Sequence, residues 1–122
     1  MKYLLDSVIV IDHFNGIAAA TSFMRLNWRD LAISAITRAE VLTGFDEAAR
    51  VKPARFLDKL ELFNIDREGA DLAAKLRREY RWKLPDALQA AAALHHGLIL
   101  VTRNTRDFPP ESLHFVVAPY LL

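Results

Sequence analysis

Cysteine is absent from this sequence of 122 residues. Its absence excludes disulfide bonds, thiolate metal sites and cysteine nucleophiles, and it fits a reducing cytoplasm. An excess of either charge is also missing, because 16 basic and 15 acidic side chains give a net charge of +1. The overall charge therefore neither requires nor excludes nucleic acid as a partner.

Long hydrophobic runs are missing too. Asp6 and Asp12 interrupt the apolar N-terminal stretch, and no small-residue cleavage site follows it, which argues against a secretory signal peptide. No stretch approaches the ~18 uninterrupted apolar residues that a membrane span needs. We therefore expect a soluble, cytoplasmic protein with no membrane partner.

Glycine-rich phosphate loops are a third absence. Neither a GxGxxG motif nor a P-loop follows a predicted strand, which argues against a nucleotide-binding Rossmann unit. Short apolar segments alternate instead with patterns of helical spacing. They predict strands at 3–5, 31–34, 62–65, 98–102 and 115–118, and helices from Thr37 through Leu42, over 54–60, over 67–80, and from Pro85 to a stop at Gly97. This alternation predicts one α/β domain over residues 1–122, with a mainly parallel central sheet.

Four acids lie near the ends of these elements. Asp6 directly follows the first strand, and Glu40 lies in the first turn of the helix after the second strand. The helix 86–96 spans about 16 Å at ~1.5 Å per residue, and the strand 98–102 spans about the same length at ~3.3 Å per residue. Asp86, at the start of that helix, therefore returns to the carboxyl end of the strand, which Asp107 follows. We expect all four at the edge where open α/β sheets bind ligands.

Taken singly, each acid has an ordinary structural explanation. Asp6 can cap the helix after its strand, and the segment from Thr37 to Glu40 matches a capping box. Asp86 suits the dipole of a first helical turn, and Asp107 can close an Asx turn. Together, however, four converging carboxylates repel one another unless a cation joins them. Oxygen ligands without His or Cys select a hard ion, Mg²⁺ or Mn²⁺, which binds phosphate and supports phosphodiester hydrolysis.

The motifs that carry these acids resemble those of a known family. They are Leu5-Asp6-Ser7, Ala39-Glu40-Val41, Leu84-Pro85-Asp86-Ala87 and the segment VTRNTRDF from Val101 to Phe108. In this order they resemble the four motifs of PIN-domain ribonucleases, and the sequence is most similar to the toxin half of VapBC-type toxin–antitoxin pairs. The resemblance runs from the first predicted strand to the last.

The resemblance implies a PIN-like three-layer fold and an endoribonuclease that needs Mg²⁺ or Mn²⁺ to cleave an RNA substrate. It also implies a homodimer and inhibition by a small VapB-like antitoxin, whose C-terminal tail enters the active-site groove and through which operator DNA is contacted only indirectly. By matching position, the metal-binding catalytic acids are Asp6, Glu40, Asp86 and, in the fourth place, Asp107, with Asn104 as a polar companion. Ser7 and Thr102 are expected to support these acids.

Basic residues accompany the acids. Arg38, Arg103 and Arg106 are predicted to contact RNA phosphate or the antitoxin's terminal carboxylate, because guanidinium binds both in a bidentate manner. Solvated charges or local ion pairs are the alternative. A further basic run, Arg77, Arg78, Arg81 and Lys83, can track an RNA backbone, although such a run is more often a solvated helix face.

The remaining candidates have mainly structural interpretations. Trp82 can stack on a base, but a partly buried tryptophan is more often in a core or dimer contact. Asp12 is interpreted as a turn or helix-surface acid. Four phenylalanines are interpreted as core or interface residues, the last two beneath an antitoxin helix: Phe14, Phe45, Phe56 and Phe63.

Two other functional classes stay open. A receiver-type signalling domain also collects acids at the edge of a parallel sheet, with Asp66 as the phosphoacceptor here, but Ser7 and Arg103 stand where it needs an acid and a lysine. A catalytically silent PIN-like binding module is the other, and the four intact acids argue against it. Specificity in a small nuclease rests on groove shape and loop contacts, so transfer, ribosomal and messenger RNA are all compatible with the sequence.

Overall fold

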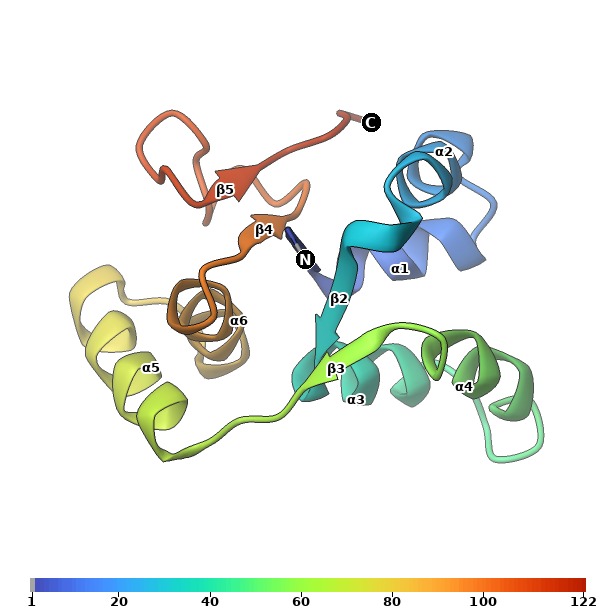
Figure 1. Ribbon diagram of the computed structural model, residues 1–122, viewed down its shortest axis with the longest axis horizontal. Coiled ribbons are helices and arrows are strands. Elements are labelled where there is room, and N and C mark those ends of the chain that lie inside the picture. Colours follow the sequence, from blue (N-terminus) through green and yellow to red (C-terminus); the bar gives the residue numbers. More distant parts are fainter. Residues whose placement is uncertain (1) are drawn as a thin grey trace.

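The chain alternates between short strands and helices in the computed structural model, which describes residues 2–122 (Figure 1). The strands are β1 (Tyr3–Leu5), β2 (Leu31–Ser34), β3 (Glu61–Phe63), β4 (Ile99–Val101) and β5 (Val116–Val117). The helices are α1 (Ser7–Phe14), α2 (Ala18–Leu26), α3 (Ala35–Thr43), α4 (Val51–Leu57), α5 (Arg67–Tyr80) and α6 (Leu84–His95), with a 3₁₀ turn, η1, over Trp28–Asp30.

These strands form one parallel sheet, in the order β3-β2-β1-β4-β5. β1 is central, because Tyr3 lies opposite Leu31 of β2 on one side and Ile99 of β4 on the other. Strands that run in one direction end along one edge of a sheet. The mainly parallel sheet predicted from the sequence is therefore confirmed, and the carboxyl ends of β1, β2 and β4 lie side by side.

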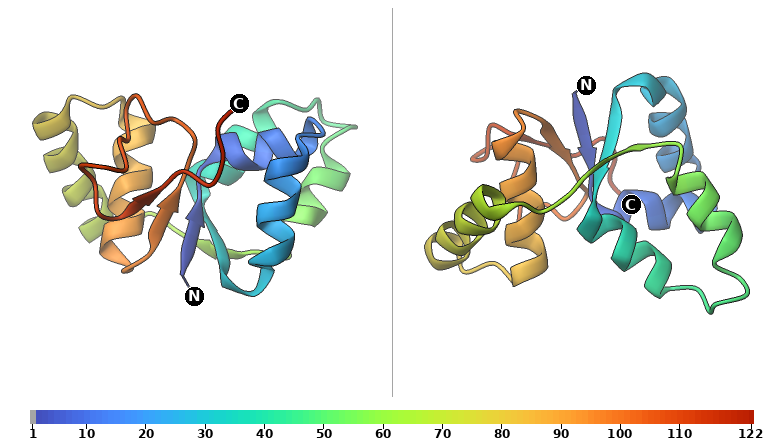
Figure 2. Two further views of the ribbon diagram at one scale, coloured as in Figure 1. Left: turned by 90° about the horizontal axis from the view of Figure 1, so that it is seen from above. Right: turned by 60° about the horizontal axis from the view of Figure 1, so that its bottom comes forward.

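The two faces of the sheet carry separate hydrophobic layers, and Figure 2 shows the helices that cover each face on either side of the sheet. Leu4 packs with α5 and α6, whereas its neighbour Leu5 packs with α1, α3 and α4, because successive side chains of a strand point to opposite faces. Five buried alanines of α6, from Ala87 to Ala93, lie in the first layer, and their small size lets the helix pack closely. This arrangement confirms the predicted α/β class with three layers.

The start of α3 differs from the prediction. The helix begins at Ala35 and is capped by Ser34, whose Oγ accepts the Thr37 backbone N–H at 3.3 Å. Thr37 cannot act as the cap, because its own hydroxyl is buried and donates to the carbonyl of Leu5 at 2.9 Å. Glu40 consequently lies in the second turn of α3 and not in the first.

Other boundaries shift by a few residues. α4 begins at Val51 rather than at residue 54, β3 ends at Phe63 rather than at residue 65, and β4 and β5 are shorter than predicted. Strands end where their partners end, and β3 pairs with β2 only through Phe63. α2 lies in a region for which the sequence pattern predicts no element, whereas α5 has its predicted bounds.

No single helix within residues 2–122 has both the length and the apolar composition to cross a membrane. Only α1 and α2 taken together have this length and composition, and the two helices are bent by 115° relative to each other. Both helices contribute buried side chains to the second hydrophobic layer, among them Ile9, Val10 and Met24.

A buried ion pair joins α1 to the last part of the chain, and it contradicts the interpretation of Asp12 as a surface acid. Asp12 is 4% exposed, and it accepts hydrogen bonds from Arg103 Nε at 2.6 Å and Nη2 at 3.0 Å. The hydroxyl of Tyr120 donates to the same carboxylate at 2.8 Å. The bonds from Arg103 are the main reason why the pKa of Asp12 is lowered.

We predict that Asp12→Asn lowers the free energy of unfolding at pH 7 by about 2 kcal/mol, because it removes one partner of a buried pair. This is below the cost for a fully buried pair, since the Arg103 side chain is 34% exposed and regains water. A carboxyl whose pKa is lowered on folding stabilises the fold above its ordinary pKa of 3.8 and loses this contribution as the pH falls through the lowered value.

Urea denaturation of both proteins between pH 7 and pH 2 measures this difference, which should shrink toward the acid end. Tyr120→Phe is the matched control, because it removes one hydrogen bond worth about 1 kcal/mol and leaves the ion pair in place. A loss for Asp12→Asn that stays constant over this range would contradict the ion pair as its cause.

Candidate active site

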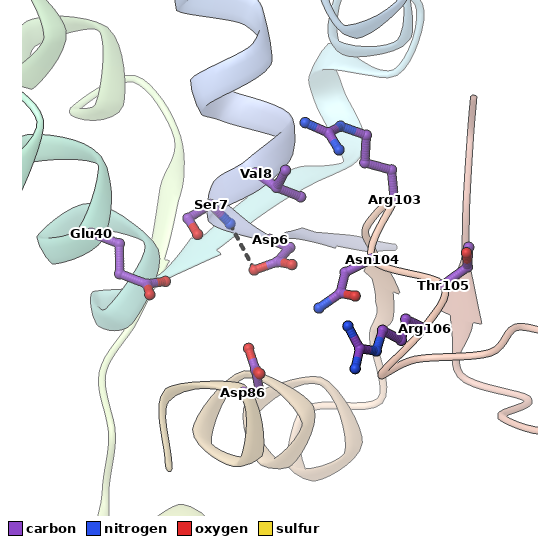
Figure 3. A pocket seen from close by; sticks show the side chains of 9 residues that line it. All are labelled: Asp6, Ser7, Val8, Glu40, Asp86, Arg103, Asn104, Thr105 and Arg106. Carbon is purple, nitrogen blue, oxygen red and sulfur yellow. Dashed lines mark hydrogen bonds between the residues drawn. The ribbon is translucent and has the colours of Figure 1, made fainter. Parts of the chain in front are cut away.

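A pocket of about 440 Å³ opens at the carboxyl edge of the sheet (Figure 3). Its walls come from the start of α1, the second turn of α3, the first turn of α6 and the loop after β4. The lining residues are Asp6, Ser7, Val8, Glu40, Asp86, Arg103, Asn104, Thr105 and Arg106. Three of the four acids predicted from the sequence therefore share one pocket.

Asp6 is the most firmly held of these acids. It follows β1 and caps α1, with one carboxylate oxygen accepting the Ser7 N–H at 2.8 Å. Thr102, directly after β4, donates its hydroxyl to the other oxygen at 2.8 Å, as expected for a residue that supports the site. Asp6 is only 7% exposed, and this burial raises its pKa despite the hydrogen bonds, with the charge of Glu40 adding to the rise.

Gln89 completes the support of Asp6, and the sequence reasoning missed it. Its amide nitrogen donates to Asp6 at 3.3 Å and to the Thr37 hydroxyl at 2.5 Å, and its oxygen accepts the Ser34 hydroxyl at 2.7 Å. The side chain is 1% exposed, so all its polar atoms are satisfied inside the protein. One signal pointed to it: Gln89 is a polar residue among the alanines of α6, one helical turn after Asp86.

Asp86 approaches the pocket from the opposite side. It lies in the first turn of α6 and is partly buried. Burial is the main reason why its pKa is raised, and the charges of Asp6 and Asp107 raise it further. In Figure 3 its carboxylate points toward Asp6, while Glu40 faces the pocket from α3. The three acids thus face one another across an open space.

Asp107 takes a different place from the one expected. It does not line the acidic pocket, and one of its oxygens accepts the side-chain amide of Asn104 at 3.0 Å. Asn104 itself lines the pocket, with its backbone N–H bonded to the Thr102 hydroxyl at 3.0 Å. Within the fourth motif, Asn104 therefore faces the pocket. Asp107 affects the pocket through its charge and through its hydrogen bond with Asn104.

The three predicted arginines have three different environments. Arg38 pairs with Asp58 at 2.9 Å and does not line the pocket. Arg103 lines the pocket, but its guanidinium is held by Asp12. Arg106 also lines the pocket, and no carboxylate of residues 2–122 forms an ion pair with it. Arg106 is therefore the arginine best placed to meet an anion.

The donors in this pocket fit a hard cation that keeps part of its water shell. They are carboxylate, hydroxyl and amide oxygens, which are the ligands that Mg²⁺ prefers, and Mg²⁺ commonly retains several waters. Within residues 2–122, no three His, Cys, Asp or Glu side chains lie close enough to enclose an ion by themselves. A cation in this pocket would therefore complete its coordination with water molecules in addition to the acids.

Asp66 would be the phosphoacceptor of a receiver-type domain, but it has a different structural role here. It caps α5 by accepting the Gly69 N–H at 2.7 Å, and it lies 3.4 Å from His95 Nε2. It does not line the acidic pocket. It also follows β3, which is an edge strand of the sheet and not a central one.

Fold and site together define a class: a small three-layer α/β protein with an acid-lined pocket at the carboxyl edge of its parallel sheet. The model of the PIN domain matches residues 3–109. The chain therefore belongs to the PIN-domain family, as the resemblance of its motifs indicates. The alternative hypothesis of a receiver-type signalling domain is wrong.

Relatives within this family are ribonucleases. The chain is 34% identical to ribonuclease VapC10 of Mycobacterium tuberculosis, over 87% of this chain and 85% of that protein. It is 30% identical to the tRNA(fMet)-specific endonuclease VapC of Shigella flexneri, over 88% of this chain and 90% of that protein. A toxin–antitoxin complex from Klebsiella pneumoniae contains a chain with 36% identity and a TM-score of 0.88, covering 99% of this chain and 100% of that one.

We predict that Asp86→Asn raises the melting temperature by a few degrees at pH 7 in the presence of a chelator. A carboxyl whose pKa is raised on folding contributes stability below its ordinary pKa of 3.8, and this contribution is lost as the pH rises through the raised value. The neutral amide escapes this loss, so the two proteins should melt together near pH 3 and separate as the pH rises. A variant that melts below the wild type at pH 7 would contradict the repulsion.

Proposed function

We propose that this chain is a metal-dependent endoribonuclease of the VapC type, the toxin of a toxin–antitoxin pair that inhibits translation or growth. The observation that carries the proposal is the convergence of Asp6, Glu40 and Asp86 on one pocket in a chain that belongs to the PIN-domain family. Its relatives VapC10 and the tRNA(fMet)-specific VapC are named for RNA cleavage. A catalytically silent binding module would not need three carboxylates that converge on one pocket.

The acids have distinct roles in this proposal. Asp6, Glu40 and Asp86 hold the cation, directly or through water, with Asn104 and Ser7 as further oxygen ligands. Asp107 supports them through Asn104. When bound, Mg²⁺ or Mn²⁺ neutralises the carboxylates, orients the phosphodiester and stabilises the negative charge that develops during its hydrolysis.

The other residues position the acids and the substrate. Thr102 and Gln89 fix the orientation of the Asp6 carboxylate, so that it cannot rotate away from the pocket. Arg106 binds a phosphate of the RNA, since its guanidinium lines the pocket without an ion-pair partner among the described residues. Arg103 is braced by Asp12 and shapes the wall of the pocket.

The partner is a small VapB-like antitoxin, which the similarity to a chain of the toxin–antitoxin complex from Klebsiella pneumoniae supports. Its C-terminal tail enters the acidic pocket and excludes RNA, the toxin forms a homodimer, and operator DNA is contacted only through the antitoxin. Phe56 and Phe63, expected beneath an antitoxin helix, pack in different hydrophobic layers: Phe56 stacks on His13 of α1, whereas Phe63 packs against His96 after α6.

For RNA cleavage, we predict that Asp86→Asn lowers kcat/KM by about 100-fold or more, because it removes one of the charges that hold the cation needed for phosphodiester hydrolysis. Asp71→Asn is the matched control, since Asp71 is an exposed acid of α5 that lines no pocket described here. Cleavage of a labelled RNA should need Mg²⁺ or Mn²⁺ and stop in EDTA. Undiminished activity of Asp86→Asn, or cleavage in EDTA, would refute the proposed site.

Metal binding can be measured without activity. Mg²⁺ should raise the melting temperature of the wild type, because a ligand that binds only the folded state stabilises it. The same titration should shift Asp86→Asn much less and Asp71→Asn as much as the wild type. Equal shifts for all three proteins would place the cation elsewhere.

A further inference from the structure

A second hollow of about 350 Å³ adjoins the acidic pocket. It is lined by Tyr80, Arg81, Trp82, Arg106, Asp107, Pro109, Ser112 and Leu113. Arg106 lines both spaces, so they meet at this side chain. The proposed function leaves the second hollow without a role.

A third hollow of about 340 Å³ continues from the second. Its lining consists of Arg77, Arg78, Arg81 and Trp82, of which Arg81 and Trp82 also line the second hollow. The acidic pocket, the second hollow and the third hollow thus follow one another across the surface. We call the second and third hollows together the aromatic–basic track.

Two stacked rings form the floor of this track. Tyr80 lies on Trp82 with ring centroids 4.4 Å apart and planes at 10°. Trp82 is 6% exposed and is locked from below, because its indole N–H donates to the Asp107 carbonyl at 2.8 Å and its ring packs on Phe108. Tyr80 remains 44% exposed. A fixed aromatic ring is therefore presented to solvent within the track.

The arginines of the track are free to bind anions. No carboxylate of residues 2–122 forms an ion pair with Arg77, Arg78 or Arg81. Arg77 donates to the Trp82 carbonyl at 2.8 Å, which holds this arginine over the end of α5. The acid that lines the track is Asp107, and it already accepts the Asn104 amide. Positive charge therefore exceeds negative charge along the whole track.

The backbone at Arg81 adds an independent indication. Arg81 ends α5 with φ +60°, and it is the non-glycine residue with positive φ among residues 2–122. Glycine is favoured at this position of a helix end because it has no Cβ to strain the left-handed conformation. A strained arginine where glycine would fold more easily points to a role for its side chain.

We propose that the aromatic–basic track binds the single-stranded RNA that flanks the cleaved bond, with one base stacked on Tyr80 and phosphates on Arg81, Arg78 and Arg106. This deepens the proposed function and rests on it. Exposed aromatic rings beside unpaired arginines are the pattern that binds single strands, since every base has a face that can stack. An acidic peptide would use the arginines but gain little from a flat exposed ring.

Binding is tested with a fluorescein-labelled oligouridylate, by fluorescence anisotropy, on the full chain in EDTA so that no cleavage occurs. Tyr80→Ala should weaken binding about 10-fold, because one stacked base is lost. Tyr80→Phe, which keeps the ring, should bind like the wild type. Lys59→Gln, an exposed cation beyond α4 on the other side of the sheet, controls for a general loss of charge.

Arg81→Gly separates a binding role from a folding role. It should raise the melting temperature, because glycine relieves the positive φ, and yet weaken RNA binding several-fold. The dependence of the logarithm of the binding constant on the logarithm of salt should become shallower by about one phosphate contact. A purely structural residue at this position would gain stability and leave RNA binding unchanged. If Tyr80→Ala does not fold, Arg81→Gly still tests whether the track binds RNA.

A cleavage assay is the second test. Tyr80→Ala should raise KM for a long RNA and leave kcat unchanged, because the ring touches no reacting atom. A dinucleotide substrate should show no difference.

Should the wild type cleave no RNA, the proposed function fails while the anisotropy result still supports or overturns the track. Unchanged RNA binding by both Tyr80→Ala and Arg81→Gly overturns the proposal. Polyglutamate that binds more tightly than RNA, and loses this advantage in Arg81→Gly, overturns it in favour of an acidic peptide.

Discussion

A negative charge held inside the edge of a parallel sheet is the constraint on which this molecule's site depends. The Asp6 carboxylate is almost buried, and three donors compensate for its lost water: the amide of Ser7, the hydroxyl of Thr102 and the amide of Gln89. They come from α1, from the end of β4 and from α6. Because each donor belongs to a different element, the orientation of this carboxylate is inseparable from how those elements pack on the sheet.

The charged acids of the site lower the free energy of unfolding. Burial and like charge raise the pKa values of both Asp6 and Asp86, which means that the fold disfavours their charged forms. The cation proposed for this site would turn the repulsion into attraction. Arg81 is a second place where stability is lost, because glycine would adopt its left-handed backbone conformation more easily than arginine does.

Arginines of the same loop differ in role because their partners differ. Arg103 and Arg106 are three residues apart and both line the acidic pocket. The buried Asp12 of α1 neutralises Arg103 and fixes its guanidinium, and the same carboxylate accepts the hydroxyl of Tyr120. Arg106 lacks such a partner among the described residues, so its charge remains available at the junction between the acidic pocket and the aromatic–basic track.

Much of this protein could be predicted from local patterns alone. Alternation of short apolar runs with helical spacing predicts the α/β class with a mainly parallel sheet. Helix α5 has its predicted bounds, because its amphipathic pattern and the Asp66 cap are local signals. Acids that follow strands or begin helices meet at one edge once the strands are parallel, and Asp6 and Asp86 were found this way. Long-range partners were not: Gln89 and Asp6 are 83 positions apart, and Arg103 and Asp12 are 91. Periodicity indicates which side of an element is buried. The chemical partner of a buried polar group depends instead on how elements distant in the chain pack together. This packing buries Asp12 beside Arg103 and leaves Asp107 outside the acidic pocket.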